Sequence, residues 1–236
     1  MSSVKEIRSV RNACALIEAV AERQPLGVSE LARLTGIEKS AAHRLAVTLH
    51  RTGWLDRAED GRWQIAAALG RLARRGAITA LTATMRPRME ALRDRTGETV
   101  MLVAIENGRL MVHETVESRH ALRIGAPAGS ELPLLRSSAV RAIAAHLPPE
   151  ELAALRRAHP ALDADPALAA VRRRGWAMND REIVSDARVV GAPILGLDGH
   201  PLAALIVCGP TSRITAQRMK HYGALVAKAV QARPES

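Results

Sequence analysis

Two short amphipathic helices joined by a glycine turn, with a tight hairpin directly after them, constrain the fold of this chain more than any other feature. The first helix is predicted to start from Ser29, the expected N-cap, and Gly36 supplies the left-handed residue that ends it. The second helix repeats apolar residues at helical spacing as far as Gly53; these are Ala42, Leu45, Ala46 and Leu49. Such a pair is typical of a helix-turn-helix, whose second helix enters the major groove of DNA.

A strand, an Asp-Gly turn and a second strand are predicted over residues 54–65, immediately after the second helix. Trp54 and Trp63 are expected to fill the small core of this region rather than to stack on bases. Another amphipathic helix is predicted over residues 7–22. Three helices and a hairpin predict a winged helix-turn-helix. The alternative for the helix pair is an ordinary helical hairpin with a solvated polar face.

Polar and basic residues on the exposed side of the second helix and beside the hairpin turn are the predicted DNA contacts. Arg44 can read guanine or hold a phosphate, and Ser40 can donate to either. Lys39 lies beside the helix start, where phosphates are favoured. The whole predicted set is Ser29, Lys39, Ser40, His43, Arg44, Arg51, Arg57 and Arg62. The pattern leaves open which of them read bases.

Composition excludes several classes of protein. A hydrophobic content of 47% over 236 residues argues against global disorder. The cysteines Cys14 and Cys208 are too few and too far apart for a disulfide framework or a thiolate zinc finger. A net charge of +10 fits a polyanionic partner, although an Ala- and Arg-rich composition explains it equally well. No secretion signal and no run of about 18 apolar residues is present, so we expect a cytoplasmic protein with no membrane partner.

The rest of the chain predicts an α+β domain preceded by a helix-rich segment at 69–97, in which Met85-Arg86-Pro87 is expected to separate two helices. Strands are predicted at 99–105, 110–116, 121–124, 189–197 and 202–208. Helices are predicted at 138–146, 150–159, 165–174 and 215–232. Strands, then helices, then strands again indicate an α+β sheet domain rather than a doubly wound one.

The order of these motifs resembles the IclR family of bacterial transcription regulators. In the N-terminal half the resemblance rests on SVRNACALIEAV, LGVSELARLTGIEKSAAHRLAVTLHRTGWL and DGRWQI. In the C-terminal half it rests on GETVMLVAIENGRLMVHETVES, ELPLLRSSAVRAIAAHLP, RRRGWAMNDREIVSDARVVGAPI and DGHPLAALIVCGPTSRIT. It covers residues 7 to about 230, and several motifs in register over two domains make a chance match improbable.

The resemblance implies a winged helix-turn-helix DNA-binding domain at 1–68, a helical linker at 69–97, and a GAF-like antiparallel-sheet domain at 98–236 for effector binding and oligomerisation. It implies a regulator that binds a near-palindromic double-stranded operator as a homodimer or homotetramer. A small-molecule effector would change the operator affinity. No catalytic residue, cofactor or metal is expected.

The turn from Leu132 to Arg141 carries the predicted effector site. Ser137 or Ser138 can cap the helix that follows, and the exposed N–H groups of its first turn suit a carboxylate. The resemblance implies effector contacts from this segment and from Asn179, Val189, Ile206 and Cys208. Leu135 stands where the family typically has His, so we expect a ligand with a polar or carboxylate head and an apolar body. The whole set is Leu135, Ser138, Ala139, Asn179, Val189, Ile206, Cys208, Met101 and Met111. Taken singly, the apolar members are more often plain core residues.

Two other classes of protein compete with this interpretation. An enzyme would need a catalytic motif, and the sequence has no nucleophile elbow, phosphate loop or metalloprotease signature. Asp180 and Glu182 form a carboxylate pair, but pairing with an arginine such as Arg181 or Arg188 is the more frequent role for such acids. An architectural DNA-binding protein would explain the basic helix but not a sensor-sized second domain.

Overall fold

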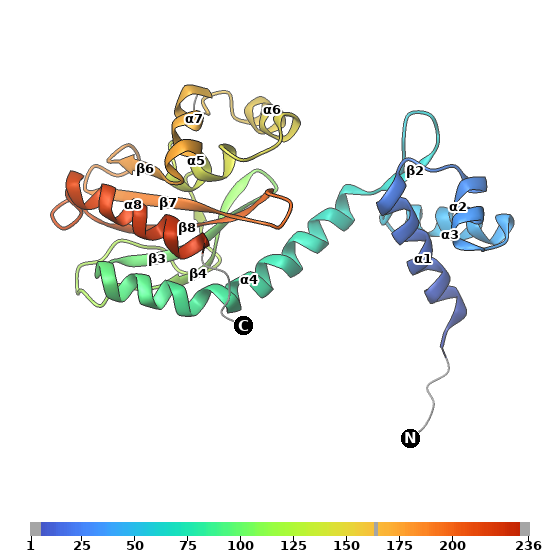
Figure 1. Ribbon diagram of the computed structural model, residues 1–236, viewed down its shortest axis with the longest axis horizontal. Helices are drawn as coiled ribbons and strands as arrows, with labels where there is room; N and C mark the ends of the chain where they lie inside the picture. Colours follow the sequence, from blue (N-terminus) through green and yellow to red (C-terminus); the bar gives the residue numbers. More distant parts are fainter. Residues whose placement is uncertain (1–5, 163–164, 232–236) are drawn as a thin grey trace, which may run out of the picture. The chain divides into compact units, whose positions relative to one another are not determined.

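The computed structural model describes residues 6–162 and 165–231, apart from the side chains of residues 71, 73–75 and 165. The chain divides into two compact units, Met1–Gly76 and Ala77–Ser236. Helix α4 (Ala67–Thr96) begins in the first unit and ends in the second (Figure 1). The segment predicted as a linker, 69–97, therefore lies almost wholly within one helix.

The first unit is a winged helix-turn-helix. It contains α1 (Arg8–Arg23), α2 (Val28–Thr35), α3 (Lys39–Arg51), β1 (Leu55–Arg57) and β2 (Trp63–Ile65). The two strands pair antiparallel, and we call residues 55–65 the wing. Apolar side chains from all three helices and both strands form one core; among them are Leu16, Val20, Leu31, Ala42, Ala46, Leu55 and Trp63. Gly36, at φ 67°, ends α2 in the left-handed conformation that the sequence predicts.

Two local predictions for this unit are wrong. The N-cap of α2 is Gly27 rather than Ser29, and its amide donates to the Glu30 carboxylate over 2.8 Å. Ser29 is exposed in the first turn of the helix. Trp63 is buried as expected, but Trp54 is 39% exposed. Side chains of neighbouring residues in an extended chain point in opposite directions. Leu55 points into the core, so the side chain of Trp54 points outward.

The second unit is built on a six-stranded antiparallel sheet with the strand order β5-β4-β3-β8-β7-β6. The strands are β3 (Thr99–Glu106), β4 (Arg109–Val116), β5 (Glu131–Leu132), β6 (Ala177–Asp180), β7 (Ala187–Leu195) and β8 (Pro201–Pro210). Every pairing is antiparallel, so the unit belongs to the α+β class rather than the doubly wound class.

Helices cover both faces of this sheet (Figure 1). On one face, α4 and α8 (Ala216–Gln231) pack against alternate strand residues such as Leu102 and Leu205. On the other face, α5 (Ser138–Ala144), α6 (Pro149–Ala158) and α7 (Asp165–Arg174) pack around Met101 and Ile206. We call this second surface the α5 face.

Three predictions for this unit need correction. Residues 121–122 form a bend and 123–124 are irregular, so no strand forms there, and β5 and β6 were not predicted. Helix α4 continues through Pro87 instead of breaking there. Met85 and Met89 are buried on either side of that proline, and this packing offsets the lost backbone hydrogen bond. The last predicted residue of the C-terminal helix, 232, lies outside the described residues.

Candidate DNA-binding and effector sites

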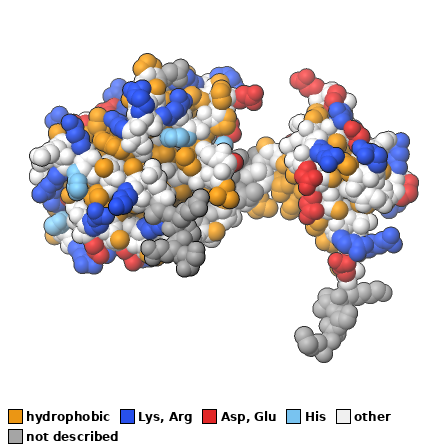
Figure 2. All heavy atoms as spheres, in the orientation of Figure 1, with side chains coloured by type: hydrophobic (Ala, Val, Ile, Leu, Met, Phe, Trp, Pro, Cys, Tyr) orange, Lys and Arg blue, Asp and Glu red, His pale blue; other side chains and the backbone are white. Residues whose placement is uncertain are grey.

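Helix α3 turns its apolar side inward and leaves a polar face in water. Ala42, Ala46 and Leu49 are buried. Five of the predicted DNA contacts are exposed on this helix: Lys39, Ser40, His43, Arg44 and Arg51. Over the described part of the chain, none of the four basic members of this group forms a salt bridge. Figure 2 shows why local placement matters more than total charge, because Lys and Arg are spread over the visible surfaces of both units.

The start of α3 is capped by an acidic side chain. The Glu38 carboxylate accepts the amides of Ser40 at 2.9 Å and Ala41 at 3.1 Å, and it also accepts the Ser40 hydroxyl. These hydrogen bonds, the Ser40 hydroxyl first, hold the pKa of Glu38 below its ordinary value. The helix start beside Lys39 therefore already holds a negative group, which sequence analysis did not anticipate.

The arginines of the wing are engaged within the first unit. Arg57 donates to the Gly61 carbonyl over 2.8 Å, and its guanidinium carbon lies 4.0 Å from the centroid of the Trp63 ring. Arg62 donates to Glu30 over 2.7 Å. Both side chains thus fix the hairpin, a role that the sequence pattern does not distinguish from direct contact with DNA.

Most of the predicted effector residues come together on the α5 face. Strand register pairs Met101 with Ile206, Cys208 with Val189, and Val189 with Asn179. Side chains of paired residues point to the same face of a sheet. Ala139, on α5, packs into the same cluster as Met101, Ile206 and Cys208.

Ser138 is the unusual polar group of this cluster. It is 1% exposed, and its hydroxyl has no hydrogen-bond partner within the described chain. Gly191 lies beside it on the sheet: a Cβ built there would lie 3.5 Å from this hydroxyl, an ordinary contact, but only 2.7 Å from Cγ2 of Ile206 on the neighbouring strand, which it would clash with. A buried hydroxyl without a partner carries a desolvation cost that a bound polar group would relieve.

Asn179 joins two loops at the edge of the α5 face. Its Nδ2 donates to the Arg136 carbonyl over 2.7 Å, and its Oδ1 accepts the Glu182 amide at 3.3 Å. The loop after β6 is also held by Arg141, which donates to Glu182 through both Nη atoms at 2.6 Å. Asp180 pairs with Arg188 at 2.7 Å and with Arg181 at 3.1 Å. The two carboxylates are thus held by arginines.

Three members of the predicted set need comment. Burial raises the pKa of the Cys208 thiol to about 12, so it is a neutral apolar group there. Leu135 is 37% exposed on the loop before α5. Met111 pairs with Ala104, which belongs to the core on the opposite side of the sheet. It therefore lies away from Met101, contrary to the sequence analysis.

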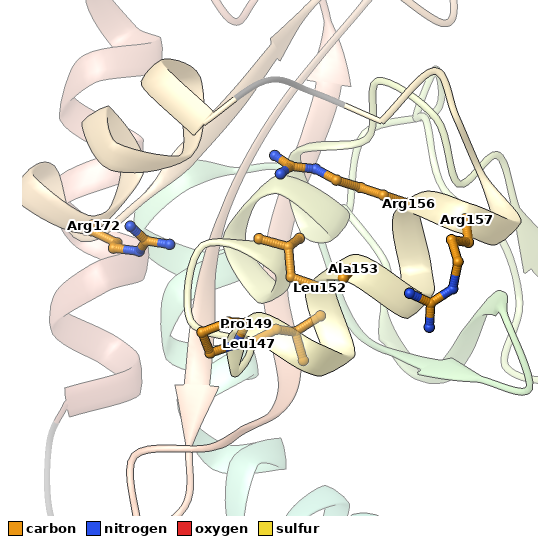
Figure 3. Close-up of a pocket in the computed structure, with 7 residues that line it drawn as sticks. All are labelled: Leu147, Pro149, Leu152, Ala153, Arg156, Arg157 and Arg172. Carbon is orange, nitrogen blue, oxygen red and sulfur yellow. The ribbon is translucent and has the colours of Figure 1, made fainter.

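A pocket of about 570 Å³ lies elsewhere, beside α6. It is lined by Leu147, Pro149, Leu152, Ala153, Arg156, Arg157 and Arg172, none of which is a predicted site residue. Figure 3 shows Arg156 and Arg157 on α6 and Arg172 on α7. The sequence pattern does not reveal this pocket, because its lining comes from separate helices and from the connection before α6.

Neither a metal site nor a membrane-spanning helix is found among the described residues. No group of three or more His, Cys, Asp or Glu side chains there is arranged to hold a metal ion. No helix of the described chain is both long and apolar enough to cross a bilayer.

Two family profiles match this chain, one for each unit. The profile described as "IclR helix-turn-helix domain" matches residues 9–59, and "Bacterial transcriptional regulator IclR C-terminal" matches residues 77–233. The second match alone spans more than half of the chain. The chain belongs to the IclR family.

Individual IclR relatives agree over nearly the full length. The transcriptional repressor IclR of Escherichia coli K12 is 29% identical over 243 residues, covering 96% of this chain and 88% of the relative. The crystal structure of HmgR from Pseudomonas aeruginosa is 28% identical, with a TM-score of 0.57 and coverage of 95% and 96%. An IclR-family regulator from Rhodococcus sp. reaches a TM-score of 0.68 at 24% identity, with coverage of 98% and 94%, and supports the fold alone. The protein is therefore a DNA-binding transcription regulator and not an enzyme.

Proposed function

We propose that this IclR-family protein is a cytoplasmic, ligand-responsive regulator whose affinity for a near-palindromic operator is changed by a small carboxylic or aromatic metabolite. It would bind DNA as a homodimer or homotetramer, placing one α3 helix in the major groove of each half-site. The observation that carries the ligand-responsive part is the buried, unpartnered Ser138 hydroxyl beside Gly191.

The α5 face suggests the chemistry of the effector. A carboxylate or other polar head would accept a hydrogen bond from the Ser138 hydroxyl near Ala139. The apolar body would lie against Met101, Val189 and Ile206, whose side chains share that face. Cys208 would contribute apolar surface, and Asn179 and Leu135 would border the site. Met111 is left out, because it belongs to the other face.

The DNA-binding surface would consist of the exposed face of α3, supported by α2 and the wing. Lys39, His43, Arg44 and Arg51 supply cationic or hydrogen-bonding groups. Ser29 lies in the first turn of α2, where N–H groups favour a phosphate. Arg57 and Arg62 would act mainly by holding the wing in place.

Helix α4 would be the connection through which the effector state reaches the DNA-binding unit, in agreement with the linker predicted at 69–97. Coupling of this kind is reciprocal, because both ligands bias one equilibrium. Operator DNA must therefore change effector affinity by the same factor by which the effector changes operator affinity. Equal effector affinity with and without operator, measured by calorimetry, would exclude the coupling.

The first test is thermal unfolding of the full chain against a panel of small carboxylic and aromatic acids. A ligand that binds only the folded state raises the unfolding midpoint in a saturable manner. Ser138→Asp should abolish that rise for an anionic ligand by like-charge repulsion. Ser212→Asp, at a surface position of the same unit, should retain it. A rise that persists in Ser138→Asp would place the ligand elsewhere, for example in the pocket beside α6.

The alternative function is a constitutive architectural DNA-binding protein without an effector. It predicts no saturable shift with any acid and little discrimination between operator and random DNA at any salt concentration. Titrating both DNAs over a range of salt concentrations therefore separates the two functions.

A further inference from the structure

The cap of α3 determines which hydrogen-bonding group Ser40 can present to DNA. Glu38 is held over the helix start by the amides of Ser40 and Ala41, and in that position its carboxylate accepts the Ser40 hydroxyl. Both Glu38 and Ser40 are exposed, so their remaining lone pairs face solvent, where DNA would approach.

A serine hydroxyl has one hydrogen to donate and two lone pairs to accept with. A carboxylate can only accept, so the hydrogen of the Ser40 hydroxyl is directed to Glu38. The hydrogen bonds to Glu38 lower its pKa, which keeps the carboxylate ionised at neutral pH. Toward any third group, Ser40 therefore offers lone pairs alone.

Major-groove base edges differ in whether they can use such an acceptor. Adenine N6 and cytosine N4 carry amino hydrogens, whereas guanine and thymine present acceptor atoms and the thymine methyl group. Phosphate oxygens are also acceptors, and the Glu38 charge repels them. We infer that Glu38 makes Ser40 an acceptor-only reader, which selects adenine or cytosine at one position of each operator half-site.

This inference rests on the proposed function only in placing α3 in the major groove. It reverses the sequence-based expectation that Ser40 donates to a phosphate or to guanine. It also assigns Glu38 a role beyond capping the start of α3, because the orientation of the Ser40 hydroxyl depends on it.

The test is selection of sites from a random duplex DNA library by the full chain, followed by titration of single-base variants of the selected site. For the unmodified protein we expect adenine or cytosine at one position per half-site, preferred over guanine and thymine by about tenfold. Ser40→Ala should remove the preference at that position alone. Glu38→Gln should admit guanine and thymine there, since a carboxamide can donate to the Ser40 oxygen and release the hydroxyl hydrogen.

Ser9→Ala is the matched control, because it removes an exposed hydroxyl on α1 of the same unit without touching α3. It should leave every base preference intact. Thermal unfolding of each variant checks that α3 still folds without its full cap. If the protein enriches specific sites but Ser40→Ala changes none of their base preferences, the inference is overturned and the proposed function stands. The absence of any enriched site would count against the proposed function itself.

Discussion

Arg62 Nη2 lies 2.7 Å from Glu30 Oε2, and the same carboxylate oxygen accepts the amide of Gly27 at 2.8 Å. One side chain thus joins the wing to the first turn of α2. The Gly27 amide, and then Arg62, lower the pKa of Glu30 from 4.5. This attachment is therefore present above that pH and is lost as the pH falls through the lowered pKa.

Arg62→Ala should weaken operator binding without changing its salt dependence. The Arg62 guanidinium is paired with Glu30 rather than with a phosphate. Its removal should therefore loosen the wing, but should not change the number of counterions that the DNA releases on binding. Arg51→Ala, at an exposed position on α3, should instead reduce the slope of log affinity against log salt by about 0.9, the value for one phosphate contact. The measurement is a fluorescence-anisotropy titration over a salt series. An equal loss of slope in Arg62→Ala would show that Arg62 contacts a phosphate.

Arg44→Ala should weaken operator binding and narrow its margin over random DNA, because Arg44 lies on the exposed face of α3 with no salt bridge to hold it in the described structure. Loss of one specific arginine contact costs about 1–3 kcal/mol. The unfolding midpoint of the Arg44→Ala variant should equal that of the unmodified protein. Arg173→Ala, an exposed arginine on α7, serves as the control in mobility-shift titrations. Unchanged affinity for the operator would remove Arg44 from the interface.

Ser138→Ala should raise the stability of the ligand-free protein by about 1 kcal/mol, since it removes a buried hydroxyl that lacks a partner. The same change should abolish the effector-dependent shift in unfolding midpoint. Urea denaturation with and without ligand measures both effects. A loss of stability would instead mean that the hydroxyl already has a favourable partner.

Cys208 should resist alkylation in the folded protein, whereas the exposed Cys14 should react. Burial first, and then the Glu98 charge, raise the pKa of the Cys208 thiol from 9.0 to about 12. Because the folded state disfavours the thiolate, this contribution to stability is complete below pH 9.0 and is lost as the pH rises toward about 12. Mass spectrometry after maleimide treatment, before and after unfolding, checks the difference. Modification of Cys208 in the native protein would show that the α5 face opens.

Sequence patterns predicted the helices of the first unit well, because their apolar residues repeat at a period that only a helix satisfies. The α3 face carrying Arg44 follows directly from Ala42 and Ala46 on the opposite side. The Glu38 cap was missed because its effect depends on side-chain geometry rather than on spacing.

The effector site was harder to predict, and Met111 shows the reason. The pairing of β3 with β4 shifts between Leu102 and Val103, so that Leu102 opposes Glu114 while Val103 opposes Val112. His113 is the one extra residue of β4 at this point. It reverses the side of the sheet to which the β4 residues before it point. Without that bulge Met111 would share the face of Met101. Alternating hydrophobicity alone does not reveal such an irregularity.

Helix α4 is not equally stiff along its length. Pro87 has no N–H to donate, and the Thr82 and Thr84 hydroxyls donate to the Ile78 carbonyl at 2.9 Å and the Ala80 carbonyl at 3.1 Å. Ile78 and Met85 before the proline, and Met89 and Leu92 after it, are all buried in the core on the sheet, so the weakened stretch lies within the packed part of the helix. A helix bends most easily where its backbone hydrogen bonds are interrupted. Helix α4 is therefore suited to follow movements of the sheet by bending near Pro87 rather than by shifting as a rigid body.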